Sequence, residues 1–255
     1  LLAHYLYCID PREDTAPAAR TERAVLPLFD AVVTTSRFAQ RALMDEDVAP
    51  NRVHVVPPGL DDPYRAPLPA RPPDETPHLL TVASWLPGKG LSTLIDQLDT
   101  LDALDWRWTL VGDDTLNPDF ADTLRPRLQD ASVADRITAP GPVAPEAMRD
   151  HYDDADLFVL PSRFETCSMA TREALARGLP VVGYDVGGMA DNLGDKNTGH
   201  LVPPDRPDAF VNALRRLLTD PETRAAMSTA ARERSTDFPT WPTAAARLQS
   251  FLRSL

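Results

Sequence analysis

Cysteine and long apolar runs are scarce in this chain of 255 residues. The two cysteines, Cys8 and Cys167, are too few for a disulfide framework, and we expect a protein of the reducing cytoplasm. No apolar run approaches the roughly 20 residues that a membrane span needs, and no signal-peptide pattern opens the chain. We therefore predict no transmembrane segment. Because Leu1 stands where Met would start a protein, we also expect a fragment.

Positive charge is also in short supply. The chain has 26 Lys and Arg residues against 38 Asp and Glu residues, which gives a net charge of −12. A negative field repels phosphate backbones and anionic lipid, so we predict that the protein binds no nucleic acid. Only Lys89 and Lys196 are lysines, and each is therefore a candidate functional residue. The Asp-rich, Lys-poor composition suggests the hypothesis of a salt-adapted organism.

Several common ligand motifs are missing or incomplete. No G-x-G-x-x-G follows a strand pattern, which argues against a nicotinamide or flavin fold. The segment 83–90 lacks the first glycine of a P-loop and the Ser or Thr after its lysine, which argues against an ATPase. Asp154 and Asp156 form an Asp-x-Asp pair, but they precede the next strand and so lie at the wrong edge for a ligand. We assign them a structural role and predict no metal site.

What the chain does have is a regular alternation of strand and helix patterns, which predicts an α/β protein. We expect strands at 1–9, 31–35, 53–56, 78–84, 106–112, 136–138, 157–160, 181–184 and about 199–202. We expect helices at 18–29, 36–46, 117–131, 146–152, 205–219, 221–235 and 241–255, one after the turn at 85–90, and another from Ser168 to Gly178. Eight prolines between 57 and 77 indicate a stiff linker. We therefore divide the chain into a partial N-terminal domain (1–58), a linker (59–77), a C-terminal domain (78–237) and a terminal helix (238–255).

The segment 157–188 is the most informative part of the chain. A buried strand at 157–160 is followed by a polar loop at 161–168 and by a helix for which Ser168 is the expected N-cap. Such a loop gathers free backbone N–H groups at the positive end of a helix dipole, so we expect an anion there. Glu165 and Glu173 flank this position. The residues alone leave open that Glu173 is an ordinary exposed helix residue and Glu165 a solvated loop charge.

The spacing Glu-x7-Glu, together with the phrase LARGLPVV and a following Gly-Gly, resembles the donor-site signature of retaining GT-B glycosyltransferases of family four. This resemblance implies Rossmann-like, doubly wound parallel sheets and a nucleotide diphosphate sugar as donor. It implies that Glu165 faces the donor sugar and that Glu173 binds the ribose hydroxyls. The loop residues that would hold the sugar hydroxyls and the diphosphate are Thr166, Cys167, Ser168 and Met169. Glycines are common in the family at positions 166 and 168, and side chains there limit how closely a ligand approaches.

Further phrases extend the resemblance over nearly the whole chain. The turn that ends in Lys89 and Gly90 is similar to the family's Lys-Gly turn, which implies that Lys89 contacts the diphosphate. An arginine that is common a few residues earlier in the family is Ser84 here, which we place in the donor site. The lost positive charge should either lower the rate or shift the arginine's task to Arg163 or Arg172. The turn after residue 141 implies a nucleobase contact at Val143.

The N-terminal phrases VVTTSRFAQRAL and RVHVVPPGLD are also similar to the family, and the terminal helix is expected to cross back onto this part. In the family a histidine at a strand end lines the acceptor side of the cleft. We do not assign that role to His4, because the expected strand begins there. We assign a structural role to His4 and to His200.

These features together predict a glycosyltransferase that moves a sugar from a nucleotide diphosphate sugar to a sugar, lipid or small-molecule acceptor, with retention of configuration. Glu165 and Lys89 are the predicted catalytic residues, and no cofactor is expected. The alternatives are a nucleotide-sugar-binding module or regulatory partner without catalysis, and a nucleotide-sugar epimerase of the same architecture. The expected lack of an N-terminal portion and the missing arginine and glycines favour the binding module, whereas the specific Glu-x7-Glu unit and Lys-Gly turn favour the enzyme.

Overall fold

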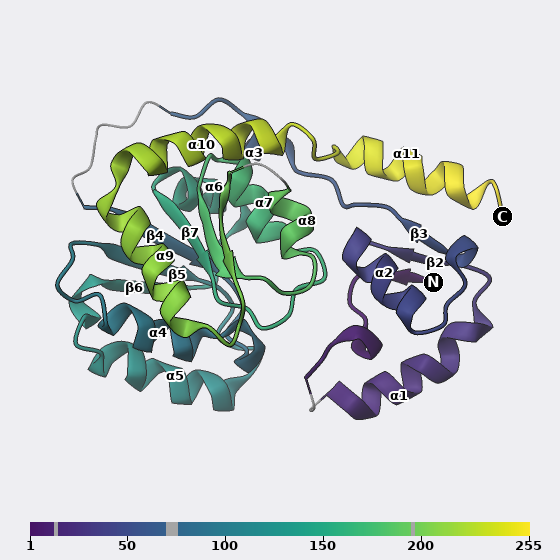
Figure 1. Cartoon of the computed structure of the whole chain (residues 1–255), viewed down its shortest axis with the longest axis horizontal. Coiled ribbons are helices and arrows are strands. Elements are labelled where there is room, and N and C mark those ends of the chain that lie inside the picture. The colour runs from purple at the N-terminus through teal and green to yellow at the C-terminus, as the bar shows by residue number, and fades with distance from the viewer. Residues whose placement is uncertain (13–14, 70–75, 195–196) are drawn as a thin grey trace.

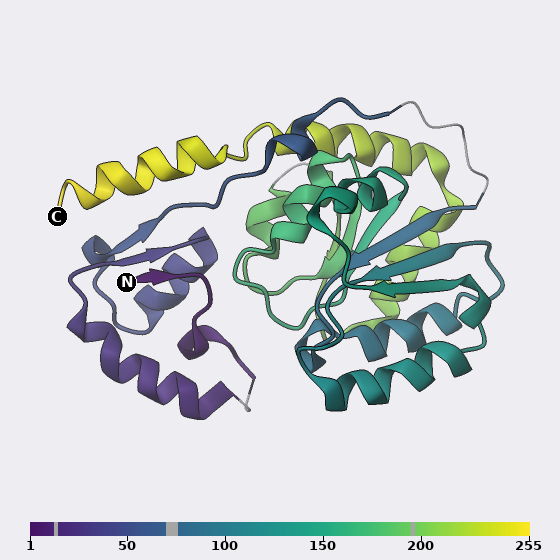
Figure 2. The same cartoon turned by 180° about the vertical axis from the view of Figure 1, so that it is seen from behind.

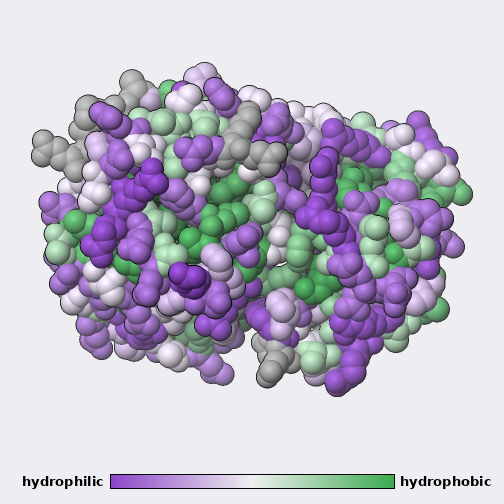
Figure 3. Space-filling view, in the orientation of Figure 1, coloured by the Kyte–Doolittle hydropathy of each residue, from purple (hydrophilic) through white to green (hydrophobic). Residues whose placement is uncertain are grey.

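The computed structural model describes residues 1–12, 15–69, 76–194 and 197–255. Strands and helices alternate in two units, each built on its own parallel sheet (Figure 1). Seen from behind, the smaller unit with the N-terminus and the larger unit lie side by side, with two chain segments passing between them (Figure 2). No helix in the described residues is long and apolar enough to cross a membrane. The face in Figure 3 is mostly polar, and apolar side chains reach it in separate patches.

The small unit has a three-stranded parallel sheet in the order β1-β2-β3. Its core is made by apolar residues of the strands and of the helices beside them, including Leu6, Val32, Leu43 and Val53. Ser36 caps the second helix as expected, because its Oγ accepts a hydrogen bond from Ala39 N at 3.1 Å. The elements are β1 (Leu2–Ala3), η1 (Tyr7–Ile9), α1 (Ala16–Val25), η3 (Leu26–Leu28), β2 (Val32–Thr34), α2 (Arg37–Asp45), η4 (Pro50–Arg52) and β3 (Val53–Val55).

The first strand is much shorter than the expected 1–9. After Ala3 the chain leaves the sheet and forms the 3-10 turn η1, whose Cys8 is buried. Side chains of α1 satisfy the backbone there: Glu22 accepts from Cys8 N at 2.7 Å, and Arg23 donates to Cys8 O at 2.8 Å. A strand partner is therefore not needed for these polar groups. The expected helix 18–29 also ends early as an α-helix, since Pro27 has no N–H to continue it.

The large unit has a six-stranded parallel sheet in the order β6-β5-β4-β7-β8-β9. Its strand order reverses between β4 and β7, and open α/β sheets bind ligands at the carboxyl edge of such a switch point. Every residue of β7 and β8 is buried, as the continuous apolar runs predict. The strands are β4 (His78–Val82), β5 (Arg107–Val111), β6 (Ile137–Gly141), β7 (Leu157–Leu160), β8 (Val181–Tyr184) and β9 (Gly199–Val202).

Helices cover both faces of this sheet (Figure 1). Helix α4 packs against α5 and α9 on one face, and α7 packs against α10 on the other. Between these layers the core contains the buried rings of Trp106, Trp108, Tyr152, Phe158 and Phe210. The elements are α3 (Asp62–Arg65), η5 (Pro87–Lys89), α4 (Leu91–Asp99), α5 (Pro118–Asp130), η6 (Ala134–Arg136), α6 (Pro145–Asp153), α7 (Met169–Ala176), α8 (Met189–Leu193), α9 (Pro207–Thr219) and α10 (Pro221–Ser235).

The last helix, α11 (Trp241–Leu252), lies over the small unit (Figure 1). The ring of Phe251 packs on His54 of β3 with the ring centroids 3.8 Å apart. Where the chain crosses between the units, Leu60 pairs with Thr240, and Leu60 N donates to Pro239 O at 2.8 Å. The two chain segments that cross between the units, one at Leu60 and one at Thr240, therefore run side by side. The domain boundaries drawn from the sequence stay a prediction.

Candidate active site

The loop at 161–168 follows the carboxyl end of β7 and leads into α7, at the edge where the strand order reverses. The backbone of Gly187 and Gly188 holds this loop. Gly188 N donates to Glu165 O at 2.7 Å, and a Cβ on Gly187, which has a φ of 57°, would lie 1.9 Å from the same oxygen. Only glycine fits at 187, because its backbone is left-handed and the loop passes so close.

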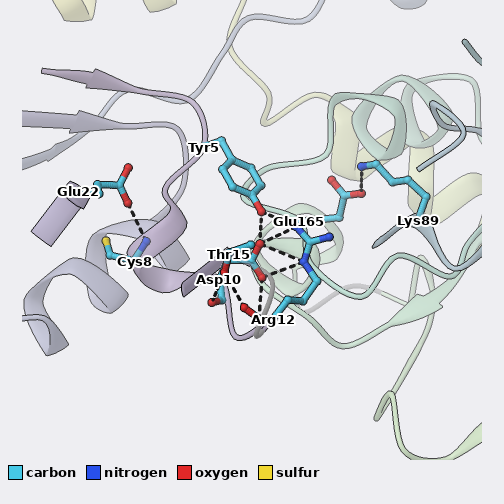
Figure 4. A network of polar contacts seen from close by, with 8 residues as sticks. All are labelled: Tyr5, Cys8, Asp10, Arg12, Thr15, Glu22, Lys89 and Glu165. Atoms are coloured by element: carbon cyan, nitrogen blue, oxygen red, sulfur yellow. Dashed lines mark hydrogen bonds and ion pairs between the residues drawn. The ribbon is translucent and has the colours of Figure 1, made fainter. Parts of the chain in front are cut away.

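Lys89 and Glu165 meet at this edge although 76 residues separate them. Lys89 Nζ lies 2.6 Å from Glu165 Oε1, and their side chains are 27% and 10% exposed (Figure 4). Gly90 makes the approach possible: with a φ of 70°, its Cβ would fall 2.1 Å from Pro161 O. Largely buried charges need a partner of opposite sign, and each supplies it to the other. The two residues predicted to be catalytic are thus brought together.

Ser168 occupies the N-cap position of α7, but its side chain caps nothing. Its backbone is left-handed, with φ 54° and ψ 86°, and its Oγ bonds to Thr171 Oγ1 at 2.8 Å. The expected capping hydrogen bond is therefore wrong, because the left-handed backbone turns the hydroxyl toward Thr171. A left-handed residue with a Cβ is strained by about 1–2 kcal/mol, which explains why glycine suits this position. Nearby, burial raises the pKa of the Cys167 thiol, so it is not a ready thiolate.

Thr166 and Phe164 connect the loop to the small unit. Thr166 Oγ1 donates to His4 O at 2.8 Å. The ring of Phe164 packs edge-on against Tyr5 and Phe38, with centroids 5.6 Å and 6.1 Å away. Because β1 ends at Ala3, His4 lies at the carboxyl end of its strand and beside the candidate site. The reason for withholding a cleft role from His4, its place at a strand start, was therefore wrong.

Arg12 is a cation at this site that the sequence did not reveal. Its Nε and Nη2 donate to the Asp10 carboxylate, and Nη2 also donates to Tyr5 OH at 2.6 Å (Figure 4). The remaining nitrogen, Nη1, points at the neighbouring turn, since a Cβ on Gly88 would lie 2.1 Å from it. Burial opposes ionisation of Asp10, yet the hydrogen bonds from Arg12 and Tyr5 lower its pKa. One arginine in an arginine-rich chain carries no sequence signal of this placement.

The two arginines offered as substitutes for the missing one have different surroundings. Arg163 is exposed and lies at the turn, where its N donates to Gly88 O at 2.9 Å. Arg172 lies elsewhere, because its guanidinium donates to Pro58 O and Asn192 Oδ1. The backbone of Arg163 thus contacts the turn that holds Lys89, whereas the Arg172 guanidinium faces Pro58 and Asn192. Ser84, just after β4, is half-exposed.

Glu173 is neither an exposed helix residue nor a partner of Glu165. Tyr152 OH donates to Glu173 Oε2 at 2.8 Å, and the Tyr152 ring meets that of Tyr64 edge-on. Burial raises the pKa of the Glu173 carboxyl, and Asp61 adds to this effect, while the Tyr152 hydrogen bond opposes it. Met169 opens α7, and Val143, beyond β6, is half-buried against the core. The roles assigned to these residues stay predictions.

The remaining sequence candidates lie away from this edge. Asp156 precedes β7 and accepts from His78 N at 2.8 Å, and Asp154 O accepts from the same histidine's ring. Both aspartates therefore lie against His78 before β7, and their structural role stays a prediction. His200 on β9 is half-buried, and burial lowers its pKa. Lys196 lies outside the described residues. Within the described ranges, no three His, Cys, Asp or Glu side chains are grouped so as to hold a metal ion.

Comparison with known proteins identifies similar chains. A family model described as "Glycosyl transferases group 1" matches residues 69–234. A D-inositol 3-phosphate glycosyltransferase of Kineococcus radiotolerans is 32% identical over 94% of this chain and 61% of its own length. A GDP-mannose-dependent alpha-(1-6)-phosphatidylinositol monomannoside mannosyltransferase of Mycobacterium tuberculosis is 31% identical over 78% of this chain and 55% of its own. The chain thus spans about three fifths of the length of such relatives.

Solved structures show the same fold. A sucrose-phosphate synthase from Thermosynechococcus elongatus matches with a TM-score of 0.84 and 24% identity, over 99% of this chain and 66% of its own. HepE from Anabaena, solved in complex with UDP and glucose, matches with a TM-score of 0.84 and 20% identity, over 100% of this chain and 72% of its own. The GT-B arrangement of Rossmann-like parallel sheets expected from the sequence is confirmed.

Proposed function

Because the chain belongs to the group 1 glycosyl transferases, we propose that it serves to transfer a hexose from a nucleotide diphosphate sugar with retention of configuration. The observation that carries the proposal is the Lys89–Glu165 ion pair at the switch point of the six-stranded sheet. This pair lies between the N-terminus of α7 and the small unit. Relatives named for GDP-mannose and a neighbour solved with UDP-glucose support a nucleotide sugar as donor. The acceptor is a sugar, a lipid or a small molecule that meets the donor from the small unit.

In this proposal the diphosphate binds between Lys89 and the start of α7. Glu165 pairs with Lys89 at 2.6 Å. A diphosphate takes over Lys89, and Glu165 is then free to accept hydrogen bonds from sugar hydroxyls and so to position the sugar. Arg12 Nη1 and Arg163, both at the Gly88 turn, add the positive charge that Ser84 does not supply. Such preorganised charges stabilise the leaving group as its charge develops.

The nucleoside half of the donor lies along α7 and the turn after β6. Glu173, already oriented by Tyr152, accepts hydrogen bonds from the ribose hydroxyls. Val143 offers backbone contacts to the base. The loop from Thr166 to Met169 presents backbone N–H groups to the diphosphate and sugar. The hydroxyl of Thr166 is engaged by His4 O, so the sugar meets mainly the backbone of the loop.

Donor binding is tested by calorimetric titration with UDP-glucose and GDP-mannose. We expect one of them to bind, and the Lys89→Met and Glu173→Ala variants to lose about 1–3 kcal/mol of binding free energy, the cost of an unpaired polar group or charge. Arg253→Gln, on the last turn of the chain, is the matched control and should bind like the wild type. If no nucleotide sugar binds, or if both site variants bind normally, the proposal fails. The anomeric configuration of the product, followed by NMR, tests retention.

We also propose that the reaction needs no metal ion, because Lys89 and Arg12 would supply the positive charge that a metal would otherwise bring to the diphosphate. Donor affinity in excess chelator should equal the affinity in Mg²⁺ or Mn²⁺. A loss of binding in chelator that either ion restores would contradict this.

A binding module without catalysis is the second candidate, favoured by the Cβ atoms at Thr166 and Ser168 and by Ser84. It predicts donor binding with no sugar transfer by a protein that carries the full length of the relatives. An epimerase would instead yield hydrolysed or epimerised donor without an acceptor.

A further inference from the structure

A cavity of about 610 Å³ lies between the two units, behind the candidate donor loop. Neither Lys89 nor Glu165 lines it, so it is separate from the proposed donor site. The small unit contributes the start of α2, the large unit contributes α7, α8 and the end of α10, and α11 contributes Arg247. A ligand in this cavity would contact both units.

Positive charge dominates the lining of the cavity. Four arginines face two aspartates there, in a protein whose net charge is −12. Both carboxylates are already engaged: Asp237 pairs with Arg234 at 2.9 Å, and Asp191 accepts from Phe38 N at 2.7 Å. Arg37 and Arg247 are exposed and make no hydrogen bond or ion pair with any residue that the structure describes. Two guanidinium groups are therefore free to bind a ligand.

Arg172, also in the lining, is a buried charge with no ion-pair partner among the residues that the structure describes. Its exposure is 6%, and its hydrogen bonds go to the neutral oxygens of Pro58 and Asn192. Its guanidinium stacks on Phe238 at 5.0 Å, with that of Arg234 on the same ring at 5.1 Å. Among the described residues it has no carboxylate within ion-pair distance. A buried cation is costly unless it is paired, so an anion nearby would stabilise this arrangement.

The start of α2 adds neutral donors to the same cavity. Thr35, which is 5% exposed, lines the cavity, and its Oγ1 is buried without a hydrogen-bond partner in the described chain. The positive end of the α2 dipole lies beside it.

We propose that this cavity binds a small molecule bearing a phosphate group, with Arg37 and Arg247 closing on the phosphate from α2 and α11. Guanidinium groups match phosphate oxygens in geometry, and an excess of two positive charges in the lining suits a dianion. The volume lies within the usual range of about 300–1,000 Å³ for small-molecule sites, which leaves room for a sugar beside the phosphate. This site goes beyond the proposed transferase function and does not depend on it.

Inorganic phosphate and mannose 6-phosphate are the probes, each titrated into the full chain by calorimetry at constant ionic strength, with sodium chloride as the ionic control. Lys89→Met removes the cation of the donor site, and the double variant Arg37→Gln/Arg247→Gln removes the free cations of the cavity. Because these two arginines are exposed and make no hydrogen bond or ion pair with the described residues, the double variant should fold normally. The double variant Arg20→Gln/Arg253→Gln loses the same charge from exposed positions away from the cavity.

We expect saturable phosphate binding by the wild type, by Lys89→Met and by Arg20→Gln/Arg253→Gln. The affinity of Arg37→Gln/Arg247→Gln should be weaker by about tenfold or more, as expected when charge-assisted hydrogen bonds are lost. Tighter binding of mannose 6-phosphate than of phosphate would identify a sugar phosphate as the ligand class, and equal binding would identify free phosphate. The cavity variant should still bind the nucleotide sugar, so the result is independent of the donor site. Binding lost in Lys89→Met but kept in the cavity variant, or no heat beyond that of sodium chloride, would overturn the proposal.

Discussion

Burial of the Glu173 carboxyl opposes its ionisation, so its contribution to stability changes with pH in a definite direction. Its folded-state pKa lies above the ordinary value of 4.5. The protonated form is therefore favoured by folding, and the stability that it contributes below pH 4.5 is lost as the pH rises through the folded pKa. Glu173→Gln keeps an acceptor for Tyr152 but cannot ionise.

We expect the stability of Glu173→Gln, relative to the wild type, to increase as the pH is raised from about 4 to about 8. Urea denaturation at several pH values measures the difference. A stability difference that does not change with pH would show that the Tyr152 hydrogen bond fully compensates burial.

Ser168 offers a second test at the residue scale, because its left-handed backbone and its hydroxyl act in opposite directions. Ser168→Gly removes the strain of a Cβ at φ 54° but loses the bond to Thr171. Ser168→Ala keeps the strain and loses the same bond. The glycine variant should therefore be more stable than the alanine variant by about 1 kcal/mol, measured by chemical denaturation. Equal stabilities would mean that the loop can relax around residue 168.

The sequence singled out Lys89 and Glu165, which the structure brings together, but not the way in which they are held. Lys89 and Glu165 could be found because a strand, loop and helix pattern surrounds Glu165 and a Lys-Gly turn surrounds Lys89. The 2.6 Å contact between them depends on tertiary packing across 76 residues. Arg12 could not be found, because its place at Gly88 follows from the turn η1, and that turn was expected to be strand.

At the scale of elements, buried strands were the most predictable features. The strands 157–160 and 181–184 match β7 and β8, since sheets covered on both faces require continuous apolar runs. The edge strand β6 extends beyond the expected 136–138 through Pro140, which an edge strand tolerates where its N–H side needs no partner. Periodicity does not distinguish such positions from a loop.

Helix α11 contributes to the small unit through one aromatic contact that can be tested. Phe251→Ala removes the ring that packs on His54, and we expect the unfolding free energy to fall by about 1 kcal/mol. Leu252→Ala is the control, because Leu252 is 56% exposed. Faster hydrogen exchange in β3 of the Phe251→Ala variant alone would localise the effect. Equal losses in both variants would argue that α11 is held elsewhere.

At the scale of the whole molecule, the residues assigned to the donor site and the small unit that faces them make different contributions to turnover. Lys89, Glu165 and Glu173 all belong to the large unit, whereas Arg12 and His4 reach the site from the small one. The small unit has three strands in the described chain, and the chain spans about three fifths of the length of its relatives. Loss of proximity and orientation can remove about 7 kcal/mol or more of catalysis.

We therefore expect this chain to bind a nucleotide sugar measurably. It should transfer the sugar far more slowly than a longer form of the same protein that has the full length of the Kineococcus relative. A coupled nucleotide-release assay with acceptor present compares the two, with donor affinity measured in parallel. Equal turnover numbers would show that the acceptor side of the site is already complete in these 255 residues.

The paired crossings between the units also bear on how the molecule responds to proteases. A Cβ on Gly59 would lie 2.3 Å from Trp241 N, so the two crossing segments are in backbone contact. The segment from Val56 to Leu60 and the segment from Pro239 to Trp241 each join the two units, and α11 rests on β3 through Phe251. A single cut in either segment would therefore leave the halves associated. Release of the small unit as a separate piece requires both cuts, so limited digestion should yield a nicked molecule that still elutes at its original size.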